Sequence, residues 1–153
     1  MNYYRISKYN SEYRKNNIYT IDEWTAYSDI GKIYNGKEFD YPEYMKIESN
    51  YIEMLVHIFK LLKIDKLKIL CLEKYEENLD WQDNEILNNE KAITFAADCL
   101  REKCWGKLYS NEFIWKTGYD FYMYLACELT LKQITEISKK YNLFVEKFKY
   151  DND

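Results

Sequence analysis

The chain has 153 residues, of which 47% are hydrophobic and 31% are charged, and its formal net charge is −4. This length suits one domain, because a second domain could hardly bury a core of its own. The hydrophobic content excludes a disordered chain. We therefore expect a single domain over residues 1–150, followed by a frayed tail at residues 151–153.

The sequence shows no sign of export or membrane insertion. The N-terminus lacks the apolar stretch of a signal peptide, and charged residues interrupt the most apolar window, residues 51–72. We therefore expect a cytoplasmic protein with no membrane partner, whose cysteines stay reduced. We also predict no metal and no cofactor, because the candidate zinc ligands are poorly spaced. These are Cys71, Cys99, Cys104, Cys127 and the single histidine, His57.

Three short elements are predicted before residue 40. The aromatic-rich segment 3–9 predicts a strand. Thr20 and Glu23 match the T-x-x-E capping box, which predicts a short helix over residues 21–27. Asn35-Gly36 separates two short apolar runs and is typical of a type I′ turn, which predicts a small hairpin.

The longest predicted helix begins near Pro42. Asp40 can cap it, and proline is tolerated in a first helical turn, where its missing N–H costs nothing. Apolar residues then recur at three- and four-residue spacing to about Lys63, which predicts a continuous buried stripe. The stripe consists of Tyr44, Ile47, Tyr51, Leu55, Ile58 and Leu62. The following segment, residues 67–72 (LKILCL), predicts a largely buried strand.

After the polar segment 73–90, a second helix is predicted over residues 89–103. Residues 104–127 predict antiparallel strands, with a bend or bulge at Gly118. Apolar residues alternate with more polar ones at the end of this region, which is the period of a strand. The inward set would be Tyr119, Phe121, Met123 and Leu125.

Thr130 and Gln133 form another capping box, which predicts a third helix that ends near Asn142, and residues 143–148 predict a last strand. Strands and helices do not alternate strictly, so the order favours an α+β fold over a parallel α/β sheet. We expect a mostly antiparallel sheet with about three main helices packed on one face. The other face would carry tyrosines.

No motif in the sequence names a reaction. The four glycines are isolated, so neither a G-x-G-x-x-G nor a phosphate-binding loop is present, and there is no G-x-S-x-G. His57 fits the flank of the long helix and has no evident nucleophile partner. Paired acids such as Glu76–Glu77 or Asp80–Asp83 could do acid–base work, but a charge run is usually a solvated loop. We predict that the protein is not an enzyme.

The most informative pattern is the charge asymmetry of residues 73–90. This segment holds seven acids against one base, a net charge of −6, which leaves +2 for the remainder because the whole chain carries −4. Such a local field attracts cationic partners and argues against nucleic acid as the main ligand. Trp81 lies inside the segment, where it could anchor an interface or pin the loop to the core. The sequence leaves both roles open.

The chain has 17 tyrosines. Tyr122 and Tyr124 could form an exposed platform on the sheet, since tyrosine offers a large contact area at little entropic cost. The alternative is the codon bias of an AT-rich genome combined with ordinary packing.

Four stretches carry a family resemblance: YYRISKYN at the start, residues 19–44 (YTIDEWTAYSDIGKIYNGKEFDYPEY) with the following ESNYI, residues 118–125 (GYDFYMYL), and LFVEKF near the end. Together they resemble a family of small proteins from Gram-positive bacteria. Some members look like the immunity proteins found beside large secreted polymorphic toxins. The resemblance spans most of the chain except residues 73–90, and it includes no catalytic motif, so it implies no site residues.

The resemblance implies an immunity protein that binds and neutralises a cognate toxin domain. Many such toxin domains are basic nucleases, which an acidic and aromatic surface would suit. The residues that we predict to contact the toxin are Glu76, Glu77, Asp80, Trp81, Asp83 and Glu85, with Asp22, Trp24, Tyr27 and Asp29 as a second group. Two other functions stay open. One is a small-molecule binder or enzyme with an aromatic pocket of Tyr119, Tyr122 and an acid, and the other is a module that self-associates through its tyrosine-rich sheet face.

Overall fold

The computed structural model describes residues 1–16, 18–19 and 21–149. Thr20 of the first predicted capping box and the predicted tail, residues 151–153, lie outside these ranges. The strands and helices within them are β1 (Asn2–Ser7), β2 (Arg14–Lys15), β3 (Ile18–Tyr19), β4 (Ile33–Tyr34), β5 (Lys37–Glu38), α1 (Tyr41–Leu61), β6 (Lys66–Lys74), β7 (Ile86–Asn88), α2 (Asn89–Leu100), β8 (Cys104–Ser110), β9 (Phe113–Thr117), β10 (Met123–Cys127), α3 (Leu131–Lys140) and β11 (Phe144–Lys147). Short 3₁₀ turns lie at Ser11–Tyr13, Tyr27–Asp29 and Tyr119–Phe121.

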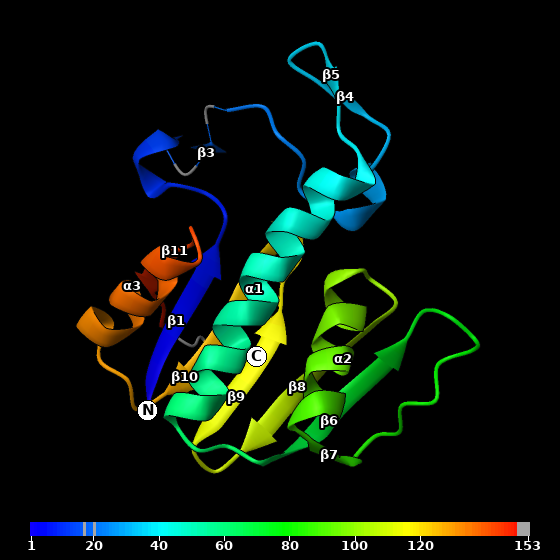
Figure 1. The fold of residues 1–153 in the computed structure, drawn as a ribbon, viewed down its shortest axis with the longest axis vertical. Helices are drawn as coiled ribbons and strands as arrows, with labels where there is room; N and C mark the ends of the chain where they lie inside the picture. The colour runs from blue at the N-terminus through cyan, green and yellow to red at the C-terminus, as the bar shows by residue number, and fades with distance from the viewer. Residues whose placement is uncertain (17, 20, 150–153) are drawn as a thin grey trace.

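Seven of these strands form one antiparallel sheet in the order β11-β1-β10-β9-β8-β6-β7. β1 lies between β10 and β11, so the first strand of the chain pairs on both sides with strands from its last third. The three α-helices cover the same face of this sheet (Figure 1). The prediction of an α+β fold, with a mostly antiparallel sheet and three main helices on one face, is confirmed.

The hairpin and the long helix form as predicted. Asn35 and Gly36 have φ values of 53° and 77°, as a type I′ turn between β4 and β5 requires. The Asp40 carboxylate caps α1 by accepting a hydrogen bond from the Glu43 N–H at 2.9 Å. The apolar stripe then lies in the core, where Tyr44, Tyr51, Leu55 and Ile58 are fully buried.

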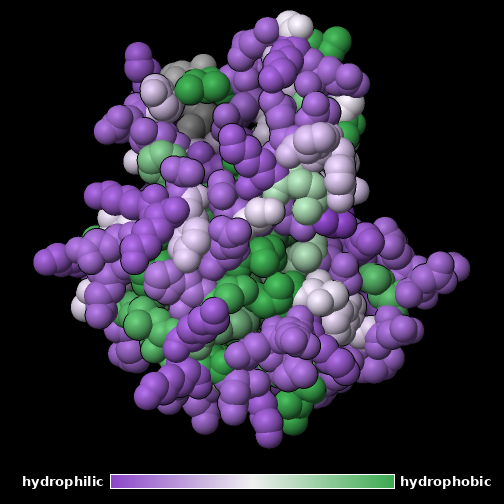
Figure 2. Space-filling view, in the orientation of Figure 1, coloured by the Kyte–Doolittle hydropathy of each residue, from purple (hydrophilic) through white to green (hydrophobic). Residues whose placement is uncertain are grey.

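The core fills the space between the helices and the sheet. Leu108, Phe113 and Trp115 are 0% exposed on the inward face of β8 and β9. Phe113 meets Phe59 of α1 edge to face, with ring centroids 5.5 Å apart. Outside the core, hydrophilic side chains dominate the helix-covered face, and hydrophobic ones are visible along its middle, over α1 (Figure 2). All four cysteines are free, and Cys71 alone among them is exposed.

The predicted helix over residues 21–27 is wrong. Residues 21–26 are irregular, and a single 3₁₀ turn, Tyr27–Asp29, begins at the last residue of the predicted helix. The Tyr9 hydroxyl donates to the Trp24 carbonyl at 3.3 Å, and the Asp29 carboxylate accepts from the N–H groups of residues 25–26 at 2.8 and 3.2 Å. These side-chain hydrogen bonds engage backbone C=O and N–H groups that a helix would pair with one another. The Trp24 ring can then enter the core.

The predicted strand through Tyr119 and Phe121 is wrong in its first half. β10 begins at Met123, and the preceding 3₁₀ turn places Asp120 and Phe121 at φ values of 58° and 62°. Tyr119 is 93% exposed instead of facing inward, whereas Phe121 is buried. Two aromatics at a spacing of two residues fit a strand and a tight turn equally well, so the alternation could not reveal the reversal.

The boundaries around the acidic segment also differ from the predicted ones. β6 extends to Lys74 and at first buries only alternate residues, so it is not the largely buried strand that the sequence predicts. β7 forms inside the segment expected to be loop. α2 ends at Leu100, because Glu102 has a left-handed φ of 61° that a continuing helix could not contain.

Gly118 supplies a test of how closely the turn before β10 is packed. A Cβ atom at this position would clash with Cε2 of Tyr124, whose ring is also packed against Phe148 with centroids 5.0 Å apart. We expect Gly118→Ala to lower the free energy of unfolding by about 1–3 kcal/mol, measured by urea denaturation. In a Tyr124→Ala background the same substitution should cost less than about 0.5 kcal/mol. Equal costs in the two backgrounds would contradict this account.

Candidate functional site

A cleft of about 820 Å³ opens at the end of the sheet where β6 and β9 finish and β8 begins. Its lining comes from four parts of the chain: residues 25–26, the end of β6 with Tyr75, the end of α2 with the start of β8, and residues 117–122. The cleft therefore lies between the two segments that the sequence predicts to bind a partner, residues 22–29 and 73–90.

A bulge in β6 shapes one wall of the cleft. Leu70 pairs with Lys107 of β8, but the next pair is Glu73 with Trp105, so β6 has one residue more than β8 between them. Cys71 accommodates the extra residue with a φ of 57°. Glu73 and Trp105 are consequently cross-strand neighbours, and both line the cleft.

The cleft is negatively charged. Glu73, Glu102 and Asp120 line it, and its described lining includes no lysine, arginine or histidine. None of the three acids forms an ion pair with another described residue. Burial, followed by a 2.9 Å hydrogen bond to the Glu73 carboxylate, raises the pKa of Tyr75 to about 12. An uncompensated set of three carboxylates favours a cationic ligand.

Aromatic rings make up much of the remaining lining. The Trp105 indole N–H donates to the Thr117 carbonyl at 2.9 Å, which holds the ring across β8 and β9. Tyr119 is 93% exposed, Tyr122 is half-buried, and Phe121 contributes a buried ring. Aromatic faces attract cations electrostatically, so the rings and the carboxylates favour the same kind of ligand.

The turn that carries Asp120 is held by a buried aromatic cluster. Phe121 packs against Trp24, Tyr44 and Tyr51, with ring centroids 5.0, 5.6 and 4.9 Å away. The Tyr51 hydroxyl also donates to the Phe121 carbonyl at 2.7 Å. A positive φ is unusual for phenylalanine, and such strain persists only where the surrounding structure imposes it. The cluster therefore fixes the position of Asp120 at the cleft.

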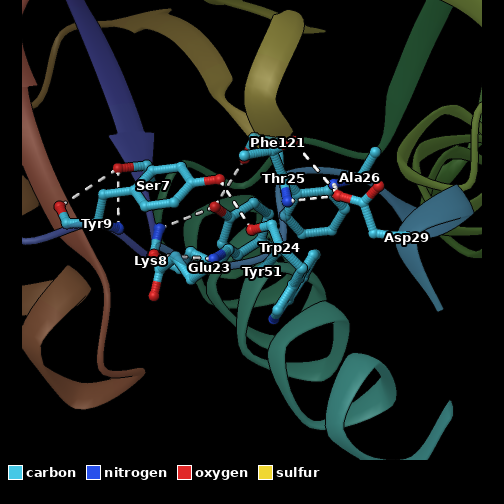
Figure 3. A network of polar contacts seen from close by, with 10 residues as sticks. All are labelled: Ser7, Lys8, Tyr9, Glu23, Trp24, Thr25, Ala26, Asp29, Tyr51 and Phe121. Atoms are coloured by element: carbon cyan, nitrogen blue, oxygen red, sulfur yellow. Dashed lines mark hydrogen bonds and ion pairs between the residues drawn. The ribbon is translucent and has the colours of Figure 1, made fainter. Parts of the chain in front are cut away.

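A buried lysine joins this cluster to the end of β1 (Figure 3). The Lys8 backbone N–H donates to the Tyr51 hydroxyl at 2.9 Å, and the Lys8 ammonium lies 4.2 Å from the Tyr9 ring and 4.3 Å from the Trp24 ring. The same ammonium pairs with the Glu23 carboxylate at 2.9 Å. Burial lowers the pKa of Lys8, and the Glu23 carboxylate partly offsets this. The buried ammonium thus ties the irregular segment to the sheet.

Two residues leave the predicted contact surface because they are buried. Trp24 is 9% exposed and stacks on Phe39 with ring centroids 4.6 Å apart, and Asp29 is 7% exposed. Their side chains stabilise the fold, so the prediction that they contact a partner directly is corrected. Asp22 is exposed and Tyr27 is half-buried, so these two residues remain accessible.

The acidic loop between β6 and β7 keeps its charges on the surface. Glu76, Glu77 and Asp80 are exposed and form no ion pair with the described residues. The Asp83 carboxylate accepts a hydrogen bond from the Leu72 N–H of β6 at 3.2 Å. The Glu85 carboxylate accepts one from the Gln82 N–H, within the loop, at 3.0 Å. The first three acids are therefore free for a partner, while the last two also shape the loop.

Trp81 pins this loop to α2. Its indole N–H donates to the Asp98 carboxylate at 2.8 Å, and its ring meets Phe95 edge to face with centroids 5.4 Å apart. The ring is half-buried. Of the two roles that the sequence leaves open, this geometry supports the structural one, and only the remaining exposed part of the ring is left for a partner.

The other candidate residues are occupied within the protein. Tyr122 lies under the Arg5 guanidinium at 4.5 Å, and Tyr124 is half-buried against Phe148, so the tyrosine platform is smaller than the sequence predicts. His57 shares a 2.8 Å hydrogen bond with the Tyr141 hydroxyl, away from the cleft. Across the described residues, no group of three or more His, Cys, Asp or Glu side chains could hold a metal ion.

Comparisons with protein-family models, with curated proteins and with solved structures found no match to this chain. In the part of the chain that the structure describes, no helix combines the length and the apolar character that a bilayer crossing requires. The cleft and the acidic loop are therefore the features of the molecule that bear on its function.

No sequence pattern marks Tyr75, Glu102 or Trp105 as parts of one site. They come together only because the end of α2 and the bulge of β6 meet at the start of β8. A weak signal was available in the pairing of acids with aromatics, E-x-Y at residues 73–75 and Y-D-F at residues 119–121. Either pattern alone is too common to indicate a site.

The buried carboxylate of Asp29 predicts a pH-dependent stability. Burial raises the pKa of Asp29, but the Lys32 ammonium and the N–H groups of residues 25–26 outweigh this and leave it below its usual value. The carboxylate therefore contributes stability above the ordinary aspartate pKa, which is lost as the pH falls through the lowered one. We expect Asp29→Asn to cost about 1–2 kcal/mol in urea denaturation at pH 7 and progressively less below about pH 4.

Asp22→Asn is the matched control for this test, since Asp22 lies in the same segment and is exposed. It should change the free energy of unfolding by less than about 0.5 kcal/mol at either pH. A cost for Asp29→Asn that stays constant from pH 7 to pH 3 would show that its charge is not what stabilises the segment.

Proposed function

We propose that this protein acts by binding a basic protein partner through its acidic loop and the adjoining cleft, and that its biological role is immunity to a bacterial toxin domain. The observation that carries the proposal is the continuity of unpaired negative charge at one end of the molecule. Glu73 and Tyr75 line the cleft, and Glu76 and Glu77 follow directly on the exposed loop. No base neutralises either part among the described residues.

An inhibitor of this kind needs no chemistry of its own. It needs a surface that exists before binding, because ordering a flexible surface would cost affinity. The Trp81–Asp98 hydrogen bond holds the loop on α2, and the Phe121 cluster holds the turn that carries Asp120. Exposed acids speed the encounter with a basic domain and select against acidic ones.

A second candidate function is the binding of a small cationic molecule in the same cleft. Its volume of about 820 Å³ is within the range of small-molecule sites. Tyr119 and Tyr122, the two aromatic residues of the alternative hypothesis, both line it, and Asp120 is an acid beside them. The exposed acids of the loop have no part in this alternative, so the two functions differ in whether charges outside the cleft contribute to binding.

Charge reversal on the loop tests the first function. Glu77→Lys with Asp80→Lys should weaken binding to a cognate basic toxin domain by about tenfold or more, with most of the loss in the association rate at low salt. The thermal melting temperature should hardly change, because neither side chain has a partner among the described residues. Surface plasmon resonance and co-expression with the toxin domain would measure affinity and protection.

Glu112→Lys with Glu136→Lys is the matched control, since both acids are exposed, lie outside the loop and the cleft, and give the same change in net charge. This control should keep its affinity to within about twofold. Equal losses in the two double variants would mean that only net charge matters, and an unchanged affinity in the first would remove the loop from the binding surface.

A further inference from the structure

We propose that the cleft is a receptor for a single guanidinium group, the arginine side chain of a protein partner. The inference rests on the proposed binding function and assigns a specific task to one part of the surface. The loop would attract the partner, and the cleft would take one of its side chains.

The position of the carboxylates favours an extended, planar cation. Glu73 lies on β6, Glu102 follows α2, and Asp120 is in the turn before β10, so the acids approach the cleft from three separate elements. A guanidinium has five N–H donors in a fixed fork and can bond carboxylates on more than one side at once. An ammonium is a compact point charge, which suits such a spread of acceptors less well.

The aromatic lining favours the same group. The hydrogen bond of Trp105 to Thr117 fixes the plane of the indole, and Glu73 is its cross-strand neighbour, so an aromatic face and a carboxylate lie side by side. Guanidinium groups are weakly hydrated and stack on aromatic faces, whereas ammonium groups hold their water more firmly. The exposed ring of Tyr119 adds a second aromatic surface in the lining.

The surroundings of the cleft indicate that the guanidinium belongs to a polypeptide. The wall formed by Glu73 and Tyr75 continues into Glu76 and Glu77, both exposed, so negative charge extends well beyond the cleft along the chain. A free small cation would gain nothing from those outer acids. A basic protein that inserts one arginine would meet them with its neighbouring lysines and arginines.

The direct test is an NMR titration of the full chain with three acetylated and amidated tripeptides, Gly-Arg-Gly, Gly-Lys-Gly and Gly-citrulline-Gly. Citrulline keeps the shape of arginine without its charge. We expect the arginine peptide to shift the Trp105 indole N–H resonance with saturation, and the lysine and citrulline peptides to bind about tenfold more weakly or worse. An equal response to citrulline, or no saturable response to arginine, would overturn the inference, and an equal response to lysine would overturn the guanidinium assignment.

Variants of the cleft give the second arm. Glu102→Gln with Asp120→Asn removes two charges at constant shape, and asparagine tolerates the φ of 58° at position 120. This variant should bind the arginine peptide about tenfold more weakly, while Glu112→Gln with Glu136→Gln, two exposed acids outside the cleft, should bind it normally. Unchanged peptide affinity in the cleft variant would overturn the inference.

The same variants separate this inference from the proposed function. If Glu77→Lys with Asp80→Lys abolishes toxin binding but the cleft variant retains it fully, the arginine receptor fails and the binding function stands. If the arginine peptide binds in a cleft-dependent way but the toxin domain does not bind at all, the receptor stands and the immunity role fails. If free arginine amide bound more tightly than the arginine peptide, the claim that the guanidinium belongs to a protein partner would be overturned.

Discussion

The left-handed turn at Asp120 and Phe121 is the constraint on which the candidate site depends. The Phe121 ring is buried among Trp24, Tyr44 and Tyr51, while its backbone holds a φ of 62° that phenylalanine rarely adopts. Burial of the ring offsets the strain, since a buried aromatic contributes about 1.5–3 kcal/mol and an αL residue costs about 1–3 kcal/mol. The turn is therefore rigid, and its neighbour Asp120 faces the cleft on a fixed backbone.

The same cluster explains the conformation of residues 21–29. Trp24 has to reach the Phe121 ring, and the Lys8 ammonium occupies the space between the Trp24 and Tyr9 rings. In a helix, successive side chains are rotated by about 100° about the axis. A helix over this segment could not place the Trp24 ring against Phe121 and also leave the N–H groups of residues 25–26 to bond the Asp29 carboxylate. The local capping signal of this segment is weaker than the tertiary packing of one indole.

The sequence was sufficient for the fold class and for most elements with strong local signals, but not for residues 21–29, the turn before β10 or the site, and the reason is physical. Periodicity and caps are local, so α1, the Asn35-Gly36 hairpin and the antiparallel strands could be predicted from neighbouring residues. The cleft depends on contacts between distant segments, such as the pairing of Glu73 with Trp105 beyond a bulge. The net charge of residues 73–90 pointed to the end of the molecule where the cleft lies, but it could not distinguish the acids that line a cavity from those that only shape a loop.

The unpaired carboxylates of the cleft are themselves an argument for a ligand. Glu73, Glu102 and Asp120 line one cleft from exposed positions, and none of them forms an ion pair with a base among the described residues. The arginines of the chain bond acids outside the cleft: Glu146 bonds both Arg5 and Arg14, and Glu48 bonds Arg101 with two hydrogen bonds. All three arginines of the sequence are thus used inside the protein and none lines the cleft. A cleft with three carboxylates and no guanidinium of its own is suited to receive one from another molecule, because a guanidinium can bond more than one carboxylate at once.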